Sequence, residues 1–360
     1  MKAYVLEGIN KLIYKEIDKP KLQKGYVLVE VKAAGICGSD IPRVFTTGTY
    51  HFPTIPGHEF SGMVVEAFDA TGAVWVGKRV GVFPLMPCKM CECCKGKQYE
   101  MCSNYNYLGS RCDGGFAEYV AVPVWNLVEL PETVSFEEAA MLEPASVALH
   151  AVRRLNLEGV SSVALFGLGT IGIIVAQWLH IYGIKTVIAT GHNDKHGDVM
   201  KSVTSNDYVY LDAKATRDAE IRADEAAGVC ERILDLTDGV GVDAVLDCVA
   251  TSVSLKDALD CVKPSGQIVI VGNPKSDVSM EKNTYWKLLR KQVRLTGTWN
   301  SSFTHDREDD WHTVLEACVD GKLVLKDLIT HPLGFDELHR GLDVMRNKSE
   351  YRNKVMICRE

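Results

Sequence analysis

The sequence predicts an α/β chain with two domains, a compact β-barrel-like domain and a parallel doubly wound sheet. Its 360 residues exceed the about 250 to 300 residues at which a single hydrophobic core stops growing. Short apolar runs broken by Gly and Pro fill the chain up to Pro131, and they indicate a barrel of short strands. After Pro131, strand-like and helix-like runs alternate, which is typical of a parallel sheet covered by helices.

Composition and charge exclude several classes of function. With 46% hydrophobic and 24% charged residues the chain has the balance of a globular protein. A net charge of -7 argues against nucleic acid or an anionic membrane as partner, because both require a basic face. No apolar run reaches the roughly 18 residues that cross a bilayer, and the first residues look like a strand rather than a signal peptide. We therefore expect a cytoplasmic protein.

Four short, largely apolar segments before Pro131 are expected to be strands, and the first of them is β-branched and half alternating. They are Tyr26–Val31, Ser61–Ala67, Gly77–Phe83 and Phe116–Val122. The loops between them carry Cys37 and the pair His58 and Glu59.

After Pro131 the apolar period becomes helical. Ser135 followed by Glu138 predicts a capping box, and a helix is expected over Ala145–Leu155. Strands are expected over Ser162–Phe166, Lys185–Ala189, Val242–Val249, Gln267–Val271 and Val355–Cys358, and helices over Ile171–Tyr182, Leu255–Val262 and Trp311–Val319. The polar segment Lys195–Thr237 is predicted only as helix and loop.

A GxGxxG motif covers Gly167, Gly169 and Gly172, with Thr170 and Ile171 between them. It follows an apolar strand and opens an amphipathic helix, which is the context a dinucleotide-binding turn requires. The first glycine permits the turn, the second lets the backbone approach a pyrophosphate, and the third allows helix and sheet to pack closely.

The acidic residue that binds the adenosine ribose is expected at the end of the next strand, about 20 positions later. Gly191 stands there instead, followed by His192 and, shortly after, Lys195. We therefore predict that discrimination against a 2′-phosphate is weakened and that NADP is accepted. The alternative is that Asp194 binds the ribose from a shifted loop.

Twelve cysteines in an intracellular chain of this length point to metal binding rather than to disulfides. Four of them are closely spaced and predict a closed structural zinc site: Cys88, Cys91, Cys94 and Cys102. Cys93 breaks the spacing and is not expected to bind the metal, and Cys112 lies outside the pattern.

A second set of zinc-binding side chains comprises Cys37, His58 and Glu59. Taken one at a time, a buried cysteine, a core histidine and a surface carboxylate explain them better than metal binding does. Glu143 alone resembles an ordinary charge at a helix end.

Together these motifs make the chain resemble the zinc-containing medium-chain dehydrogenases, whose GroES-like catalytic domain is split around a Rossmann domain. The resemblance rests on Gly35–Asp40, Gly57–Gly62, the four-cysteine segment, Asp113–Tyr119 and the GxGxxG glycines. It implies a catalytic domain in residues 1–145 and 297–360, and a dinucleotide-binding domain in residues 146–296.

Glu143 stands where other members of the family have a cysteine, which resembles the polyol dehydrogenase branch. The resemblance implies Cys37, His58 and Glu143 as ligands of a catalytic zinc, with Glu59 as a carboxylate that can exchange onto the metal. It also implies Ser39 as the group that accepts the alcohol proton, although Pro42 replaces the relay histidine of some relatives.

Three segments resemble polyol-phosphate members of the branch: Ser39–Phe45, Leu108–Arg111 and Gly297–Asn300. Arg43 replaces a residue that is usually aromatic and lines the substrate pocket, so its guanidinium is a candidate phosphate ligand. A surface salt bridge explains Arg43 equally well. Asn300 is a candidate substrate contact.

The expected reaction oxidises a secondary alcohol of a polyol or polyol phosphate to a ketose or ketose phosphate. Two zinc ions per chain and NAD or NADP are the expected cofactors, and a homodimer or homotetramer is expected by analogy. Two alternatives stay open: a dehydrogenase for another secondary alcohol of the sorbitol, threonine or butanediol type, and a catalytically silent relative with a binding or structural role.

Overall fold

The structure is a computed structural model that describes residues 1–205, 207–213 and 228–359. The chain divides into two compact units. The first unit comprises Met1–Ser146 and Ser301–Glu360, and the second comprises Val147–Asn300. No helix in the described ranges is both long enough and apolar enough to span a membrane.

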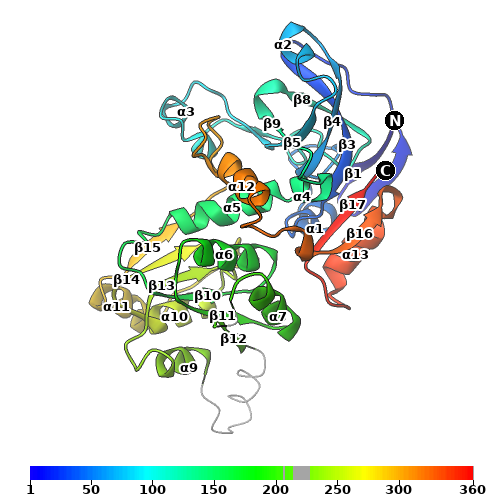
Figure 1. Ribbon diagram of the computed structural model, residues 1–360. Helices are drawn as coiled ribbons and strands as arrows, with labels where there is room; N and C mark the ends of the chain where they lie inside the picture. Colours follow the sequence, from blue (N-terminus) through cyan, green and yellow to red (C-terminus); the bar gives the residue numbers. More distant parts are fainter. Residues whose placement is uncertain (206, 214–227, 360) are drawn as a thin grey trace. The chain divides into compact units, whose positions relative to one another are not determined.

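The first unit is built around a seven-stranded sheet (Figure 1). Its strands, in spatial order, are β16 (Ile329–Gly334), β17 (Lys354–Cys358), β3 (Tyr26–Gly35), β4 (Glu59–Ala67), β5 (Arg79–Val82) and β9 (Leu127–Glu129), with β8 (Tyr119–Pro123) also paired to β3. Two smaller pairs are β1 (Lys2–Gly8) with β2 (Lys11–Glu16), and β6 (Leu85–Met86) with β7 (Asn106–Tyr107).

Short helices connect these strands. They are α1 (Asp40–Phe45), α2 (Ala70–Ala73), α3 (Glu92–Lys95), α4 (Phe136–Ala140), α12 (Asp310–Val319) and α13 (Leu338–Asn347), with 3-10 turns at Tyr99–Met101, Val124–Asn126, Lys326–Leu328 and Phe335–Glu337. The predicted capping box is confirmed, because Ser135 Oγ accepts from the Glu138 amide while the Glu138 carboxylate accepts from the Ser135 amide. Helix α5 (Leu142–Arg153) follows directly.

The register of three strands decides where the first unit can hold chemistry. Gly35, the last residue of β3, pairs with Glu59 on β4 and with Met356 on β17. Strands from the start and the end of the chain therefore meet at the residue that precedes the Ile36–Cys37 loop.

The second unit is a six-stranded sheet in which every neighbouring pair is parallel. Its order is β12 (Val209–Asp212), β11 (Thr186–Gly191), β10 (Ser162–Phe166), β13 (Val242–Asp247), β14 (Val262–Ile270) and β15 (Arg294–Gly297). Helices α6 (Thr170–Ile181) and α7 (Asp194–Ser202) contact each other, and α10 (Ser252–Cys261) contacts both α9 (Val229–Asp235) and α11 (Lys282–Arg290). The predicted doubly wound parallel sheet is confirmed.

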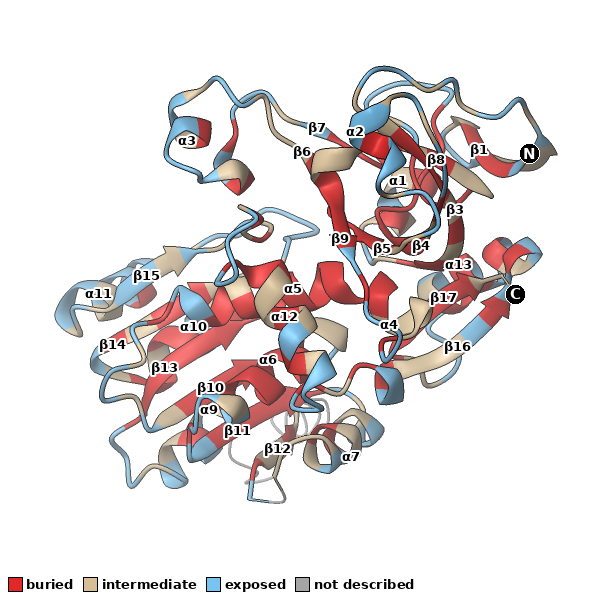
Figure 2. Ribbon diagram, turned by 45° about the horizontal axis from the view of Figure 1, so that its top comes forward, coloured by how far each residue is buried: buried red, intermediate tan, exposed pale blue. Residues whose placement is uncertain are grey.

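Buried residues run along the central strands of both sheets (Figure 2). In β13 all six residues are buried, as expected for a parallel strand covered on both faces.

The prediction for Lys195–Thr237 was wrong in one respect, since it contains the strand β12 as well as helices. The four residues of β12 are mostly half-buried, so the continuous apolar run that marks the central strands is absent. Part of the predicted segment, residues 206 and 214–227, lies outside the described residues.

Candidate active site and metal centres

Cys37, His58 and Glu59 bring their ligand atoms within 4.8 Å of one another in the first unit. Cys37 lies in the loop between β3 and α1, and His58 immediately precedes β4, which begins at Glu59. The pairing of Gly35 with Glu59 holds these two segments together. A thiol, an imidazole and a carboxylate at this spacing suit a zinc site that keeps one position open.

Asp40 supports two of these ligands from behind. Its Oδ2 accepts a hydrogen bond from the Cys37 amide at 2.9 Å, and its Oδ1 lies 3.5 Å from His58 Nδ1. Burial alone would raise the pKa of Asp40, but the charges of His58 and Arg43 lower it overall. A carboxylate on Nδ1 orients the ring and leaves Nε2 for a metal.

Electrostatics at this cluster favour a cation. Burial disfavours the charged form of His58, yet Asp40 and Cys37 outweigh that effect and raise the pKa of His58 well above its ordinary value. The same acceptors that hold a proton on the ring favour a metal ion in its place.

Glu59 forms a buried ion pair with Lys354, a residue 295 positions away in sequence. Both side chains are almost completely buried, at 2% and 4% exposure. Burial lowers the pKa of Lys354, but the charges of Glu59 and Cys37 raise it overall, so the ammonium stays charged. Gly35 makes room for the pair, since a Cβ there would meet Glu59 Oε2 and lie 2.7 Å from Lys354 Cε.

Ser39 and Arg43 lie beside Cys37 and are joined to each other. Ser39 Oγ donates to Cys37 Sγ at 3.2 Å and accepts from Arg43 Nη1 at 2.9 Å. The same Nη1 lies 3.3 Å from Asp40 Oδ1 and 3.3 Å from His58 Nδ1. Arg43 therefore faces the ligand cluster, and its salt bridge to Asp40 is internal to that cluster.

Glu143 is buried close to the cluster but is not one of the three residues whose ligand atoms lie within 4.8 Å of one another. Its Oε1 accepts from the Tyr107 hydroxyl at 3.1 Å, and the Tyr107 ring lies 5.8 Å from the His58 ring. Burial raises the pKa of Glu143, and burial and Glu143 together raise the pKa of Tyr107 well above its ordinary value. The role of Glu143 as a zinc ligand stays a prediction.

The four predicted structural ligands, Cys88, Cys91, Cys94 and Cys102, gather in one group within 4.8 Å. Backbone amides point at their sulfurs: Cys88 N donates to Cys102 Sγ at 3.2 Å, and Cys91 N donates to Cys88 Sγ at 3.4 Å. Backbone hydrogen bonds, from Cys94 first, lower the pKa of Cys91 to about 6. Four thiols in this arrangement fit tetrahedral zinc.

In the second unit the GxGxxG turn joins β10 to α6. Gly167 has φ +89°, a conformation that favours glycine, and a Cβ on Gly172 would collide with the Gly167 carbonyl oxygen. A Cβ on Gly169 would meet no atom within 4 Å, so the turn is open at that residue. Thr170 and Ile171 begin α6, whose N-terminus carries the positive end of the helix dipole.

Gly191 ends β11, the strand on which the ribose carboxylate was expected. Its space is bounded by Tyr210, whose hydroxyl accepts from the Asn193 amide at 3.1 Å. His192 and Lys195 are exposed just after the strand, and so is Asp194 in the first turn of α7. Both predicted ribose arrangements are therefore still available.

Asn300 has φ +55° and ends the second unit, whereas Arg43 belongs to the first. The contact of Asn300 with substrate stays a prediction.

Sequence reasoning assigned no role to Asp40, Tyr107 or Lys354. The supporting role of Asp40 could have been predicted, because this acidic residue lies only three positions after the predicted ligand Cys37. Lys354 carried only a weak signal, a charge at the start of the apolar strand that ends the chain.

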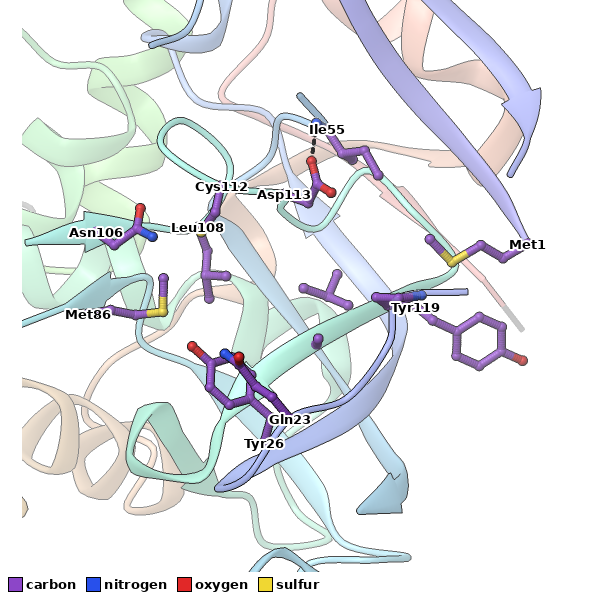
Figure 3. A pocket seen from close by; sticks show the side chains of 13 residues that line it. Met1, Gln23, Tyr26, Ile55, Met86, Asn106, Leu108, Cys112, Asp113 and Tyr119 are labelled. Carbon is purple, nitrogen blue, oxygen red and sulfur yellow. Dashed lines mark hydrogen bonds between the residues drawn. The ribbon is translucent and has the colours of Figure 1, made fainter. Parts of the chain in front are cut away.

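A cavity of about 280 Å³ lies elsewhere in the first unit (Figure 3). Met86, Asn106, Leu108, Cys112 and Asp113 are among its lining residues, and Asp113 accepts from the Ile55 amide at 2.9 Å. None of the predicted zinc ligands lines it.

Comparison with known proteins agrees with this geometry. Residues 23–132 match the alcohol dehydrogenase GroES-like domain, and residues 170–320 match the zinc-binding dehydrogenase domain. Galactitol 1-phosphate 5-dehydrogenase of Escherichia coli K12 is 30% identical over 343 residues, which cover 95% of each chain. Sorbitol dehydrogenase of Bacillus subtilis is 27% identical over an aligned region that covers 99% of this chain and 97% of the sorbitol dehydrogenase chain.

A zinc-binding dehydrogenase from Sinorhizobium meliloti, solved bound to NADP, superposes with a TM-score of 0.85 at 27% identity, covering 99% of each chain. The predicted combination of a GroES-like domain with a Rossmann domain is thereby confirmed. The chain belongs to the zinc-binding dehydrogenases, the family of NAD(P)-dependent alcohol and polyol dehydrogenases.

Proposed function

We propose that this enzyme oxidises a secondary alcohol of a polyol or polyol phosphate to the corresponding ketone. The observation that carries the proposal is the convergence of Cys37, His58 and Glu59 ligand atoms within 4.8 Å, with Ser39 and Arg43 beside them. Residues 1–145 and 297–360 form the catalytic domain in this proposal, and residues 146–296 bind the dinucleotide.

Cys37, His58 and either Glu59 or Glu143 would hold a zinc ion, which would supply Lewis-acid chemistry, and NAD or NADP would supply the hydride acceptor. Cys88, Cys91, Cys94 and Cys102 hold a second, structural zinc. Gly167, Gly169, Thr170, Ile171 and Gly172 position the cofactor pyrophosphate.

Ser39 is the proposed proton acceptor: its hydroxyl takes the alcohol proton while it passes its own proton on to water or another group. Its hydroxyl already donates to Cys37 and accepts from Arg43, so one lone pair is left to accept a hydrogen bond from the substrate hydroxyl. Arg43 holds Ser39 in place through Nη1, and the remaining N–H groups of its guanidinium are the proposed phosphate donors. Asn300 is a proposed substrate contact.

Glu59 is the proposed exchange partner of Glu143 at the metal. Lys354 holds the Glu59 carboxylate in the ion pair described above. While that pair is intact, Glu59 shares its charge with the ammonium, which favours Glu143 as the third ligand.

A polyol phosphate is supported by the 30% identity to galactitol 1-phosphate 5-dehydrogenase over 95% of both chains. An unphosphorylated polyol is the second candidate, supported by the 27% identity to sorbitol dehydrogenase. NADP is supported by Gly191 in place of an acidic residue and by exposed His192 and Lys195 behind it. We propose a cytoplasmic homodimer or homotetramer.

The deciding experiment is a panel of galactitol 1-phosphate, galactitol, sorbitol, xylitol, threonine and 2,3-butanediol, each with NAD and with NADP, followed by nicotinamide absorbance. Turnover of polyols with a preference for the phosphate ester supports the proposal. Activity confined to threonine or the diol contradicts the substrate class, and no turnover by zinc-replete enzyme contradicts the function.

The cofactor proposal has its own test. We expect kcat/KM with NADP to equal or exceed that with NAD, and Asp194→Asn to leave the ratio unchanged. A strong NAD preference that Asp194→Asn abolishes would instead assign ribose binding to Asp194.

A further inference from the structure

We propose that Arg111 is an anion-binding residue that receives the phosphate group of a phosphate-ester substrate. Its guanidinium lies between two aromatic rings, 4.1 Å from the centroid of Tyr50 and 4.4 Å from that of Tyr105. These two cation–π contacts, called the sandwich below, use the flat faces of the guanidinium and not its N–H edge.

Among the residues that the structure describes, no carboxylate pairs with the edge of this guanidinium. Arg111 Nε is buried and makes no hydrogen bond, and within the described ranges no Asp or Glu lies at ion-pair distance from the side chain. Arg43, Arg340 and Arg359 each pair with a carboxylate. The two terminal nitrogens of the Arg111 guanidinium are not buried and make no hydrogen bond within the described residues, so their N–H groups are the donors open to an anionic ligand.

The position of Arg111 connects this cation to the ligand cluster. The Arg111 amide donates to the Tyr107 carbonyl at 2.9 Å, so one tight turn carries both residues. The Tyr107 side chain faces Glu143 and the His58 ring. The turn also packs directly on Gly57, the residue before His58, since a Cβ on Gly109 would collide with the Gly57 backbone.

Contacts other than those of the Arg111 side chain also hold this turn. His51 Nε2 lies 3.1 Å from the Arg111 carbonyl, Tyr50 N donates to the Ser110 carbonyl at 3.4 Å, and Ile55 N donates to Asp113 Oδ1 at 2.9 Å. These contacts use backbone atoms or other side chains. The hydrogen bonds that hold the turn therefore leave the N–H groups of the guanidinium unused.

A phosphate monoester fits this arrangement. It is a doubly charged, hydrogen-bond-accepting group that a planar guanidinium binds with two parallel N–H bonds. Arg43 faces the ligand cluster, so a substrate oxidised at one end and phosphorylated at the other would place its phosphate on Arg111 rather than on Arg43. Tyr50 is 68% exposed, so the sandwich is open to solvent on that side.

Binding is tested without turnover, by titrating inorganic phosphate into the zinc-replete enzyme in a calorimeter. We expect Arg111→Gln to weaken phosphate binding by about tenfold or more, the loss of one charged bidentate contact. Arg340→Gln, which removes an exposed arginine charge paired with Glu337, serves as control and should bind like wild type. Equal affinity of Arg111→Gln and wild type, or equal losses in both variants, overturns the proposal.

Because the assignment to a substrate rests on the proposed function, kinetics form a second arm. Arg111→Gln should raise KM for the polyol phosphate about tenfold and leave kcat/KM for the unphosphorylated polyol unchanged. Equal losses on both substrates would show that Arg111 only holds the turn. A wild-type enzyme that binds phosphate but oxidises no polyol contradicts the proposed function, not the anion site.

If Arg111→Gln does not fold, Tyr50→Ala tests the same cation, since it removes the exposed ring and keeps the charge. We expect several-fold weaker phosphate binding, and unchanged binding would contradict the sandwich as the source of the site.

Discussion

The four-cysteine group and the Cys37–His58–Glu59 cluster both gather metal-ligand atoms, but over different lengths of chain. All four cysteines lie between Cys88 and Cys102, and backbone amides of the same segment point at their sulfurs. The other cluster joins the loop after β3 to the start of β4 and depends on Lys354 at the start of β17, 295 positions from its partner. Local spacing builds the first site, whereas strand pairing builds the second.

The two sites also differ in how charge is balanced. The cysteine group contains no carboxylate, so a metal ion is its natural counter-charge. The other cluster carries a buried Glu59–Lys354 pair and a buried Asp40 between His58 and Arg43. Removing one member of such a network leaves a charge without its partner, which is far more costly than losing an exposed ion pair.

The largest effect is expected from a change in the four-cysteine group. Cys94→Ser removes one of four ligands, and we expect the structural zinc to be lost. The effect is large because zinc binding supplies about 10–16 kcal/mol in small zinc sites. Metal analysis should then find about one zinc per chain in place of about two. Cys93→Ser, one residue away and outside the group, should keep the wild-type content; equal losses would contradict this assignment of ligands.

The second largest effect is expected at the Cys37–His58–Glu59 cluster, from a change in Lys354. Lys354→Met leaves the Glu59 carboxylate buried without its partner, and we expect a loss of about 3–5 kcal/mol in the free energy of unfolding. Urea denaturation measures it. Lys256→Met breaks an exposed pair with Asp260 and should cost at most about 1 kcal/mol; a comparable cost would refute the contrast.

Asp40→Asn tests the support behind the ligands. The variant keeps the shape of the side chain but removes the charge that faces His58 Nδ1. We expect zinc affinity at this cluster to fall about 10- to 100-fold while the cysteine site is unchanged. Competition with a chelator should therefore release one metal much earlier in the variant, and a simultaneous release of both would argue against separate sites.

The smallest effect is expected from Gly35→Ala, which sharpens the comparison because it alters no ligand. The added methyl group would push on the ends of Glu59 and Lys354. Both are ends of flexible side chains, so we expect only about 1 kcal/mol of destabilisation, at the low end for overpacking. Gly38→Ala, where a Cβ meets no atom within 4 Å, is the control in the same denaturation assay.

Much of the fold followed from local patterns. The strand of Ser162–Phe166 was predicted residue for residue, and the Ser135 capping box was confirmed. Strand β12 was missed because an edge strand buries little and has no continuous apolar run. The GxGxxG turn was predictable because strand, glycines and helix follow one another directly.

The sequence by itself determined the fold class, the cysteine group and the dinucleotide turn, since each depends on residues that are close together in the chain. Only the tertiary structure placed Lys354 against Glu59, Asp40 behind His58 and the Arg111 guanidinium between Tyr50 and Tyr105. The physical reason is that strand register, not spacing, brings such residues together. Gly35 pairs with Glu59 on one side and with Met356 on the other, and no local pattern encodes that meeting.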